Sequence, residues 1–188
     1  MFRRLTRERY LTDSELKRFM ETVRTRRHKN QPRDHAFFAL LANTGIRPSE
    51  ARALTRDDVH LGGREPWIRV RRLKKKRPTS DDLQIPQGLA TTLCAYLSYL
   101  PVTENSLFRI TLRQAARLFQ LYRKRAHVHR CPMYALRHTA ATRIYRATRD
   151  IKIVQAVLGH ETPDVSAIYA HIPRSLLVET ADATTPIV

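Results

Sequence analysis

The sequence predicts a mainly α-helical fold with a small antiparallel β-hairpin or sheet inserted into it. Through most of the chain, apolar residues recur at the spacing of three and four that is typical of amphipathic helices. Between residues 67 and 86 this period is lost, and the composition favours extended backbone instead. Apolar residues make up 42% of the 188 positions, which is enough to build a sizeable core.

The first two helices can be located from capping and apolar residues. Residues 12–15, Thr-Asp-Ser-Glu, have the form of a capping box, and apolar residues follow at helical spacing as far as Val23. A polar stretch, residues 24–33, then precedes an almost wholly apolar run at residues 36–42. Gly45 follows where a helix can end, so we expect a buried second helix.

The β insertion comes next, and helices return after it. Residues 67–70 have the composition of a strand, and Leu83 and Ile85 alternate with polar neighbours, which predicts a hairpin or a three-stranded sheet. Further helices are expected at residues 89–100, 112–119, 136–144 and 151–158. Because no internal repeat or long linker divides the chain, we expect one domain, with its core at about residues 10–175 and a tail at 176–188.

The charge balance indicates the class of partner. Lysine and arginine outnumber aspartate and glutamate by 35 to 17, which gives a net charge of +18. This excess is interspersed with apolar residues, so it decorates a folded surface rather than a disordered basic arm. Such a surface favours a polyanion, and we expect double-stranded DNA.

Other features argue against several classes of protein. Cys94 and Cys131 have neither metal-ligand spacing nor the even-numbered framework of a disulfide scaffold. No segment approaches the roughly 20 apolar residues that span a bilayer, and no apolar signal core follows the basic start. We therefore expect a cytoplasmic, nucleoid-associated protein with no metal, no cofactor and no membrane partner.

Three strings carry candidate chemistry. The first is TGIRPSEARAL at residues 44–54, the second is ALRHTAAT at residues 135–142, and the third runs from LGH at residues 158–160 to Tyr169. Taken singly, each has an ordinary structural interpretation. An arginine after a helix-ending glycine, a histidine at a helix end and a tyrosine in a core are all common.

Together and in this order, the strings resemble the tyrosine recombinase family, the phage integrases. That family has an arginine in a TGxRxSE string, an LRHTxAT string, an LGH string, and a tyrosine nine residues after that histidine. The resemblance covers residues 10–175 and implies the catalytic-domain fold of the family. It also implies roles for four residues: catalytic arginines Arg47 and Arg137, histidine His160 and nucleophile Tyr169.

The residue types suit that chemistry. Attack on a phosphodiester places extra negative charge on the non-bridging oxygens, and a fork-shaped, always protonated guanidinium binds such oxygens bidentately. A tyrosine phenol has a reference pKa of about 10, and neighbouring cations favour its phenolate form as it attacks. A phosphotyrosine link retains the energy of the broken bond, so rejoining needs no ATP.

Three positions or segments need separate comment. The family supplies the proton for the leaving oxygen from a lysine in a β-hairpin turn, and Lys74 aligns best with it, although Lys75 or Lys76 could substitute. Residues 78–82 are expected to make this hairpin longer and less regular than the common family form. Tyr134 stands where most members have a histidine, and a tyrosine can donate a hydrogen bond but titrates at far higher pH.

Short of the usual family length, the chain resembles the small one-domain members that invert promoter segments, so we expect no separate N-terminal core-binding domain. Basic residues in two places are candidates for phosphate contact, although a charge cluster can also be a solvated face. These candidates are Arg71, Arg72, Lys75 and Lys76 near the hairpin turn, and Arg113, Arg117, Arg123, Lys124 and Arg125 on a predicted helix.

The leading functional interpretation is site-specific recombination by integration, excision or inversion. The resemblance implies a homotetramer on paired DNA sites, a 3′-phosphotyrosine intermediate, and accessory DNA-bending proteins as a further class of partner. A type IB topoisomerase, which shares the chemistry, is one alternative. A catalytically decayed DNA-binding regulator is another, and the detection of a covalent protein–DNA adduct would reject it.

Overall fold

The computed structural model describes residues 9–72 and 79–159, and residues 1–8, 73–78 and 160–188 lie outside the described part. The described residues form seven α-helices and one three-stranded antiparallel sheet. This arrangement confirms the predicted mainly α fold with a small β insertion. No described helix is long and apolar enough to cross a membrane.

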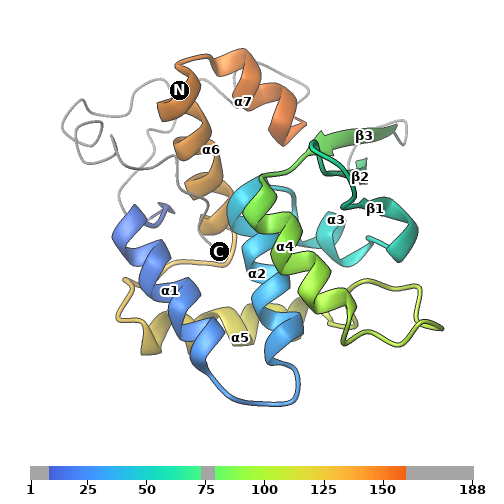
Figure 1. Ribbon diagram of the computed structural model, residues 1–188. Coiled ribbons are helices and arrows are strands. Elements are labelled where there is room, and N and C mark those ends of the chain that lie inside the picture. The colour runs from blue at the N-terminus through green and yellow to red at the C-terminus, as the bar shows by residue number, and fades with distance from the viewer. Residues whose placement is uncertain (1–8, 73–78, 160–188) are drawn as a thin grey trace.

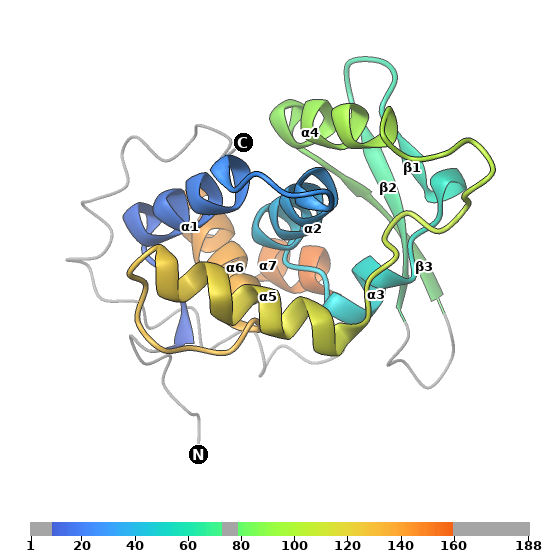
Figure 2. The same ribbon diagram turned by 90° about the horizontal axis from the view of Figure 1, so that it is seen from below.

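The helices surround a central one, and the sheet lies at one side (Figure 1). Figure 2, seen from below, shows α5 running across the molecule, with its N-terminal end near α3. The α-helices are α1 (Asp13–Thr25), α2 (Gln31–Thr44), α3 (Pro48–Arg52), α4 (Gln87–Leu97), α5 (Leu112–Arg125), α6 (Ala135–Thr148) and α7 (Ile151–Leu158). The remaining elements are the 3-10 turn η2 (Arg56–Asp58) and the strands β1 (Val59–His60), β2 (Trp67–Arg72) and β3 (Thr79–Gln84).

Helix α1 begins as its sequence predicts. The Thr12 hydroxyl accepts a hydrogen bond from the Glu15 backbone N–H at 3.2 Å, and the Glu15 carboxylate accepts one from the Thr12 backbone N–H at 2.9 Å. This reciprocal pair satisfies two N–H groups that a helix start would otherwise leave without partners. The apolar face of α1 then packs against α2 and α5, where Phe19 meets Phe38 edge to face.

Helix α2 is the central element, packing against α1, α4 and α6. It begins at Gln31, before the apolar run at residues 36–42 that predicted it, because Pro32 suits the first turn of a helix and Asp34 is buried there. Tyr122 donates a hydrogen bond to the Asp34 carboxylate at 2.9 Å, so this charge has a partner inside the fold. The helix ends where predicted, at Gly45 in the left-handed region with φ of +66°.

The sheet has the order β1–β2–β3. Trp67 pairs with Gln84 and Arg72 with Thr79 at the two ends of the β2–β3 ladder, while β1 supplies a third strand from before the predicted segment. Residues 79–82 belong to β3 and pair with β2, so they extend the strands of the hairpin. Along β2 the even-numbered positions are buried and Arg69 and Arg71 are exposed, as the pleat of a one-sided sheet requires.

Candidate active site

Parts of three sequence strings meet around Arg137. This side chain is 2% exposed, and its Nη1 donates to the Gly45 carbonyl at 2.6 Å while Nη2 donates to the Leu158 carbonyl at 2.9 Å. A fork-shaped guanidinium can serve two acceptors in one plane, so Arg137 ties the end of α2 to the end of α7. Segments far apart in the sequence therefore adjoin, as a shared catalytic site requires.

Gly45 of the first string is required both by close packing at this point and by its backbone conformation. A Cβ on Gly45 would lie 2.7 Å from Leu158 Cδ2 and 3.1 Å from the Ala140 Cβ. The first of these separations is closer than real side chains tolerate, and the φ of +66° already disfavours a larger residue. Gly45 thus lets α2, α6 and α7 approach one another.

Arg47 stands two residues further on, at the N-cap of α3. Its Nη1 donates to Glu50 Oε1 at 2.9 Å, and its backbone N–H donates to Glu50 Oε2 at 2.8 Å. The Glu50 side chain is fully buried, whereas that of Arg47 is 20% exposed. The carboxylate therefore holds both the backbone and the guanidinium of Arg47, whose side chain remains partly exposed.

Tyr134 lies beside the buried arginine and is 42% exposed. It precedes the first residue of α6, with its ring 6.0 Å from Arg137 Cζ and in edge-to-face contact with His138 at 5.2 Å. Burial, reinforced by the charges of Arg9 and Arg137, lowers the pKa of His138 to about 4. The imidazole is therefore neutral at physiological pH.

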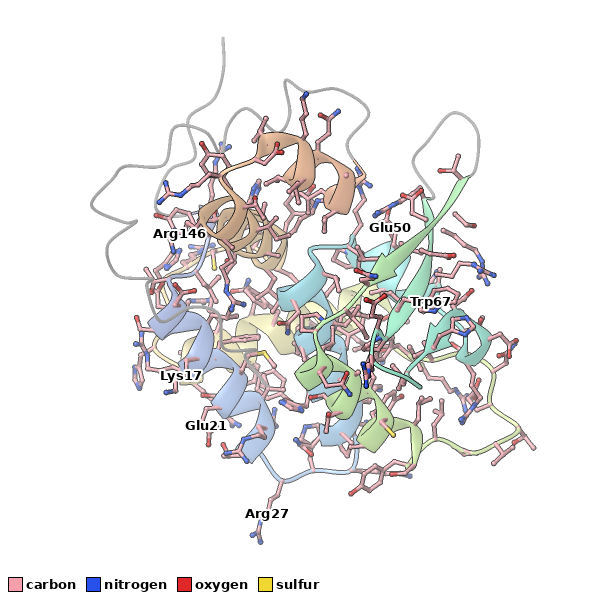
Figure 3. All side chains as sticks on the ribbon, turned by 45° about the horizontal axis from the view of Figure 1, so that its top comes forward. Lys17, Glu21, Arg27, Glu50, Trp67 and Arg146 are labelled. Carbon is pink, nitrogen blue, oxygen red and sulfur yellow. The ribbon has the colours of Figure 1, made fainter. Side chains whose placement is uncertain are left out.

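Arg72 does not lie on the surface that the sequence suggested for it. It is 1% exposed, and its Nε lies 2.6 Å from Asp81 Oδ2 while its Nη1 lies 3.5 Å from Glu50 Oε2. The expectation of direct phosphate contact is therefore corrected to an interior ion pair. Figure 3 labels Glu50 in this region, where α3 packs against β2.

Arg71, by contrast, is half-exposed and points away from that interior. Its Nη2 contacts both carboxylate oxygens of Asp58 at 2.9 Å, and its Nη1 donates to the Ala53 carbonyl at 3.2 Å. The remaining predicted residues of the site and of the turn lie outside the described part of the chain. These are Lys74, Lys75, Lys76, His160 and Tyr169.

Helix α5 carries the second basic group, and it packs against α3, which follows Arg47. Arg113, Arg117 and Lys124 are exposed and separated by four and seven residues, so they lie along one face of the helix. Arg125 is exposed on a neighbouring face. Arg123 is only partly exposed, because its Nη1 donates a hydrogen bond at 2.9 Å to the Val128 carbonyl, just beyond the C-terminal end of the helix.

Glu50 was not assigned a role from the sequence and Arg72 was assigned the wrong one, although signals for both existed. Glu50 follows Arg47 by three residues, the spacing at which side chains of a helical turn meet. Arg72 follows Ile68 and Val70 at the period of two that marks the buried face of β2. Among the described residues, no group of three or more histidine, cysteine, aspartate or glutamate side chains is placed to hold a metal ion.

This geometry can be compared with known proteins. Residues 9–175 match the model of the phage integrase family. The chain belongs to that family. Tyrosine recombinase XerC of Neisseria meningitidis serogroup B is 30% identical over 166 residues, which cover 82% of this chain and 52% of XerC. Tyrosine recombinase XerA of Pyrococcus furiosus is 27% identical over 92% of this chain and 60% of its own length.

Two solved recombinase structures share the fold. XerH site-specific recombinase bound to a palindromic difH substrate, in a post-cleavage complex, superposes with a TM-score of 0.76 at 25% identity, over 92% of this chain and 52% of XerH. XerA recombinase gives a TM-score of 0.75 at 26% identity, over 98% of this chain and 66% of XerA. The chain spans about half to two thirds of the length of these relatives.

Proposed function

We propose that this chain is the catalytic domain of a site-specific DNA recombinase, which cleaves and rejoins DNA strands through a covalent 3′-phosphotyrosine at Tyr169. The observation that carries this proposal is the contact of Arg137 with Gly45 and Leu158. That contact joins the strings bearing both proposed catalytic arginines to the helix end that leads directly to His160. Family membership supports the same interpretation.

In the cleavage step, the Tyr169 hydroxyl loses its proton to water, its oxygen attacks the scissile phosphorus, and the bond from phosphorus to the 5′ oxygen breaks. Arg47 and Arg137 bind the non-bridging oxygens, whose negative charge grows in the transition state. The partly exposed side chain of Arg47 can contact DNA from the surface, and buried Glu50 restrains its motion. Removing one such preorganised donor from a comparable site costs about 3–4 kcal/mol of transition-state stabilisation.

Proton transfers complete the step. Lys74 donates a proton to the departing 5′ oxygen, with Lys75 or Lys76 as substitutes, and His160 hydrogen-bonds the phosphate as its charge develops. Tyr134 donates a hydrogen bond to the scissile phosphate or to Tyr169, because its ring lies beside Arg137 and much of it is exposed. The products are a 3′-phosphotyrosine and a free 5′ hydroxyl, and attack by a 5′ hydroxyl restores the phosphodiester.

The substrate that fits this surface is double-stranded DNA. Arg113, Arg117 and Lys124 form one exposed row on α5, and Arg125 lies beside it, so this helix can track a phosphate backbone next to Arg47. Half-exposed Arg71 adds a contact from the sheet, together with Lys75 and Lys76 of the turn. The net charge of +18 supports the same partner through counterion release.

Paired sites imply assembly. We propose a homotetramer that exchanges strands two at a time, with accessory DNA-bending proteins to bring the sites together. XerH, a relative, has been solved on a palindromic substrate, which fits pairwise binding of protomers. We place this action on nucleoid DNA in the cytoplasm.

The proposal is tested with a pool of nicked duplexes whose arms carry randomised sequence. A strand cut next to the nick releases a short fragment, so the covalent adduct cannot reverse and accumulates on a denaturing gel. We expect adduct with the wild-type chain and none with Tyr169→Phe, although both bind the duplexes. No wild-type adduct at any arm sequence would refute the proposal. Adduct at many sequences with relaxation of supercoils would indicate topoisomerase activity instead.

A further inference from the structure

Arg72 lies where three elements of the site meet, although nothing in the proposed chemistry requires an arginine there. It ends β2, and it is among the largest fully buried side chains of the described residues. We propose that Arg72 is a positioning residue, which caps the C-terminal end of α7 and thereby orients the chain that continues to His160 and Tyr169. This inference rests on the proposed function for its catalytic consequence, but its structural part can be measured without catalysis.

The first support is charge compensation. A guanidinium cannot be deprotonated in a protein, so a fully buried one needs acidic partners. Arg72 has Asp81 at 2.6 Å from β3 and Glu50 at 3.5 Å from α3, and Glu50 is also the partner of Arg47. The same carboxylate therefore joins the proposed catalytic arginine to the buried one.

The second support is the cap itself. Arg72 Nη2 donates to the Val157 carbonyl at 3.1 Å, and its Nη1 lies 3.5 Å from the Leu158 carbonyl. The last carbonyls of a helix lack partners within the helix and carry partial negative charge, so a cation is stabilising there. Arg137 donates to the same Leu158 carbonyl, and the two arginines thus hold one helix end from two sides.

The third support is that α7 has little else to hold it. It spans eight residues, and its buried apolar residues form a small cluster apart from the main core. That cluster contains Val154 and Leu158 of α7 and Ala141 of α6, with the partly buried Ile144, Tyr145 and Ile151 packed against it. A helix with so few apolar contacts depends strongly on the polar contacts at its end.

The fourth support is the close approach at Gly159. A Cβ there would lie 2.7 Å from Arg72 Nε and 2.8 Å from Cζ, and Gly159 has φ of +64°. The backbone that leaves α7 therefore runs directly over the guanidinium. In this chain, the glycine of the LGH string is required by the buried arginine as well as by the helix end.

Hydrogen–deuterium exchange tests the structural part. Arg72→Met keeps the length of the side chain and removes the cap, Arg72→Lys keeps the charge without the fork, and Arg69→Met is the matched control. Arg69 is on the same strand, but its ion pair with Asp82 is exposed and reaches no helix. We expect amides of residues 151–159 to exchange roughly tenfold faster or more in Arg72→Met, to a smaller extent in Arg72→Lys, and as in wild type in Arg69→Met. Amides of α4 provide the internal reference.

If Arg72→Met does not fold, Arg72→Lys carries the comparison with Arg69→Met. Faster exchange confined to residues 151–159 supports the cap. Exchange in α7 equal to that of wild type in a folded Arg72 variant would overturn it. Because this measurement needs no DNA, it distinguishes failure of the cap from failure of the proposed recombinase activity, which would appear as a wild-type chain without adduct.

Single-turnover cleavage tests the consequence for the reaction. At saturating DNA, we expect Arg72→Met to cleave roughly tenfold to a hundredfold more slowly, with DNA affinity within about twofold of wild type because the side chain is buried. A bridging 5′-phosphorothiolate needs no proton on its leaving group, so it should restore Lys74→Ala but leave Arg72→Met equally slow. If Arg72→Met weakens DNA affinity but leaves the cleavage rate unchanged, Arg72 contacts DNA directly. If the phosphorothiolate restores cleavage by Arg72→Met, Arg72 positions the hairpin turn that carries Lys74 instead of α7. Either result would overturn the proposal.

Discussion

Gly45→Ala tests the contact on which the proposed site depends. The alanine would have to adopt φ near +66°, which costs about 1–2 kcal/mol for a residue with a Cβ. Its methyl group would also lie 2.7 Å from Leu158 Cδ2 and 3.1 Å from the Ala140 Cβ, and forcing apart a packed interior costs about 1–3 kcal/mol more. We therefore expect Gly45→Ala to lower the free energy of unfolding by about 2–5 kcal/mol.

The chain offers two matched controls for this substitution. Gly63 has φ of +89° but nothing within 4 Å of an added Cβ, so Gly63→Ala measures backbone strain alone. Gly62 also has open space around it and no positive φ, so Gly62→Ala should be neutral or slightly stabilising. The difference between Gly45→Ala and Gly63→Ala then isolates the packing of α2 against α6 and α7.

Urea unfolding followed by circular dichroism supplies the free energies, with equal slopes required before midpoints are compared. We expect Gly62→Ala to be the most stable of the three variants, Gly63→Ala to be less stable, and Gly45→Ala to be the least stable. Equal destabilisation by Gly45→Ala and Gly63→Ala would refute the reasoning, because it would mean that a Cβ at residue 45 meets no steric conflict with Leu158.

Three further predictions concern single side chains. Tyr134→Phe should slow single-turnover cleavage by roughly tenfold to a hundredfold if its hydroxyl donates one charge-assisted hydrogen bond, and Tyr134→His should retain activity; a rate equal to wild type for Tyr134→Phe would exclude that role. Arg117→Ala should reduce the slope of log affinity against log salt by about 0.9, whereas Lys17→Ala on α1 should leave the slope unchanged. A slope for Arg117→Ala equal to that of wild type would show that α5 does not contact DNA. His138 has a pKa of about 4 in the fold against 6.5 ordinarily, so its contribution to stability is complete above pH 6.5 and is lost as the pH falls toward 4. The free energy of unfolding should fall by up to about 3 kcal/mol over this range in the wild type, and this fall should be absent in His138→Gln. Parallel curves of unfolding free energy against pH for the two proteins would contradict the prediction.

Much of the fold could be predicted from local sequence. The capping box at Thr12 located the start of α1, and the apolar spacing at residues 151–158 gave α7 its observed bounds. These signals work because helix starts and buried faces depend on residues close together in the chain. The start of α2 was missed because Asp34 is charged, and its burial depends on contacts with Arg33 and with the distant Tyr122.

For the candidate site, the sequence indicated candidate residues but not their contacts. The sequence motifs pointed to Arg47 and Arg137. However, no feature of the nearby sequence indicated that Arg137 would donate hydrogen bonds to the carbonyls of Gly45 and Leu158. Arg72 was misassigned because charge was weighed above strand position. Its place on the buried face of β2, together with acidic residues on β3 and α3, outweighs the usual exposure of arginine.

Tyr169 is the residue that we propose forms the covalent bond to DNA. Mass spectrometry of the nuclease-trimmed and protease-digested adduct identifies both the modified residue and the DNA end attached to it. The proposed function predicts a nucleotide remnant joined through its 3′ phosphate to the oxygen of Tyr169. A remnant on any other residue, or one joined through a 5′ phosphate, would contradict it.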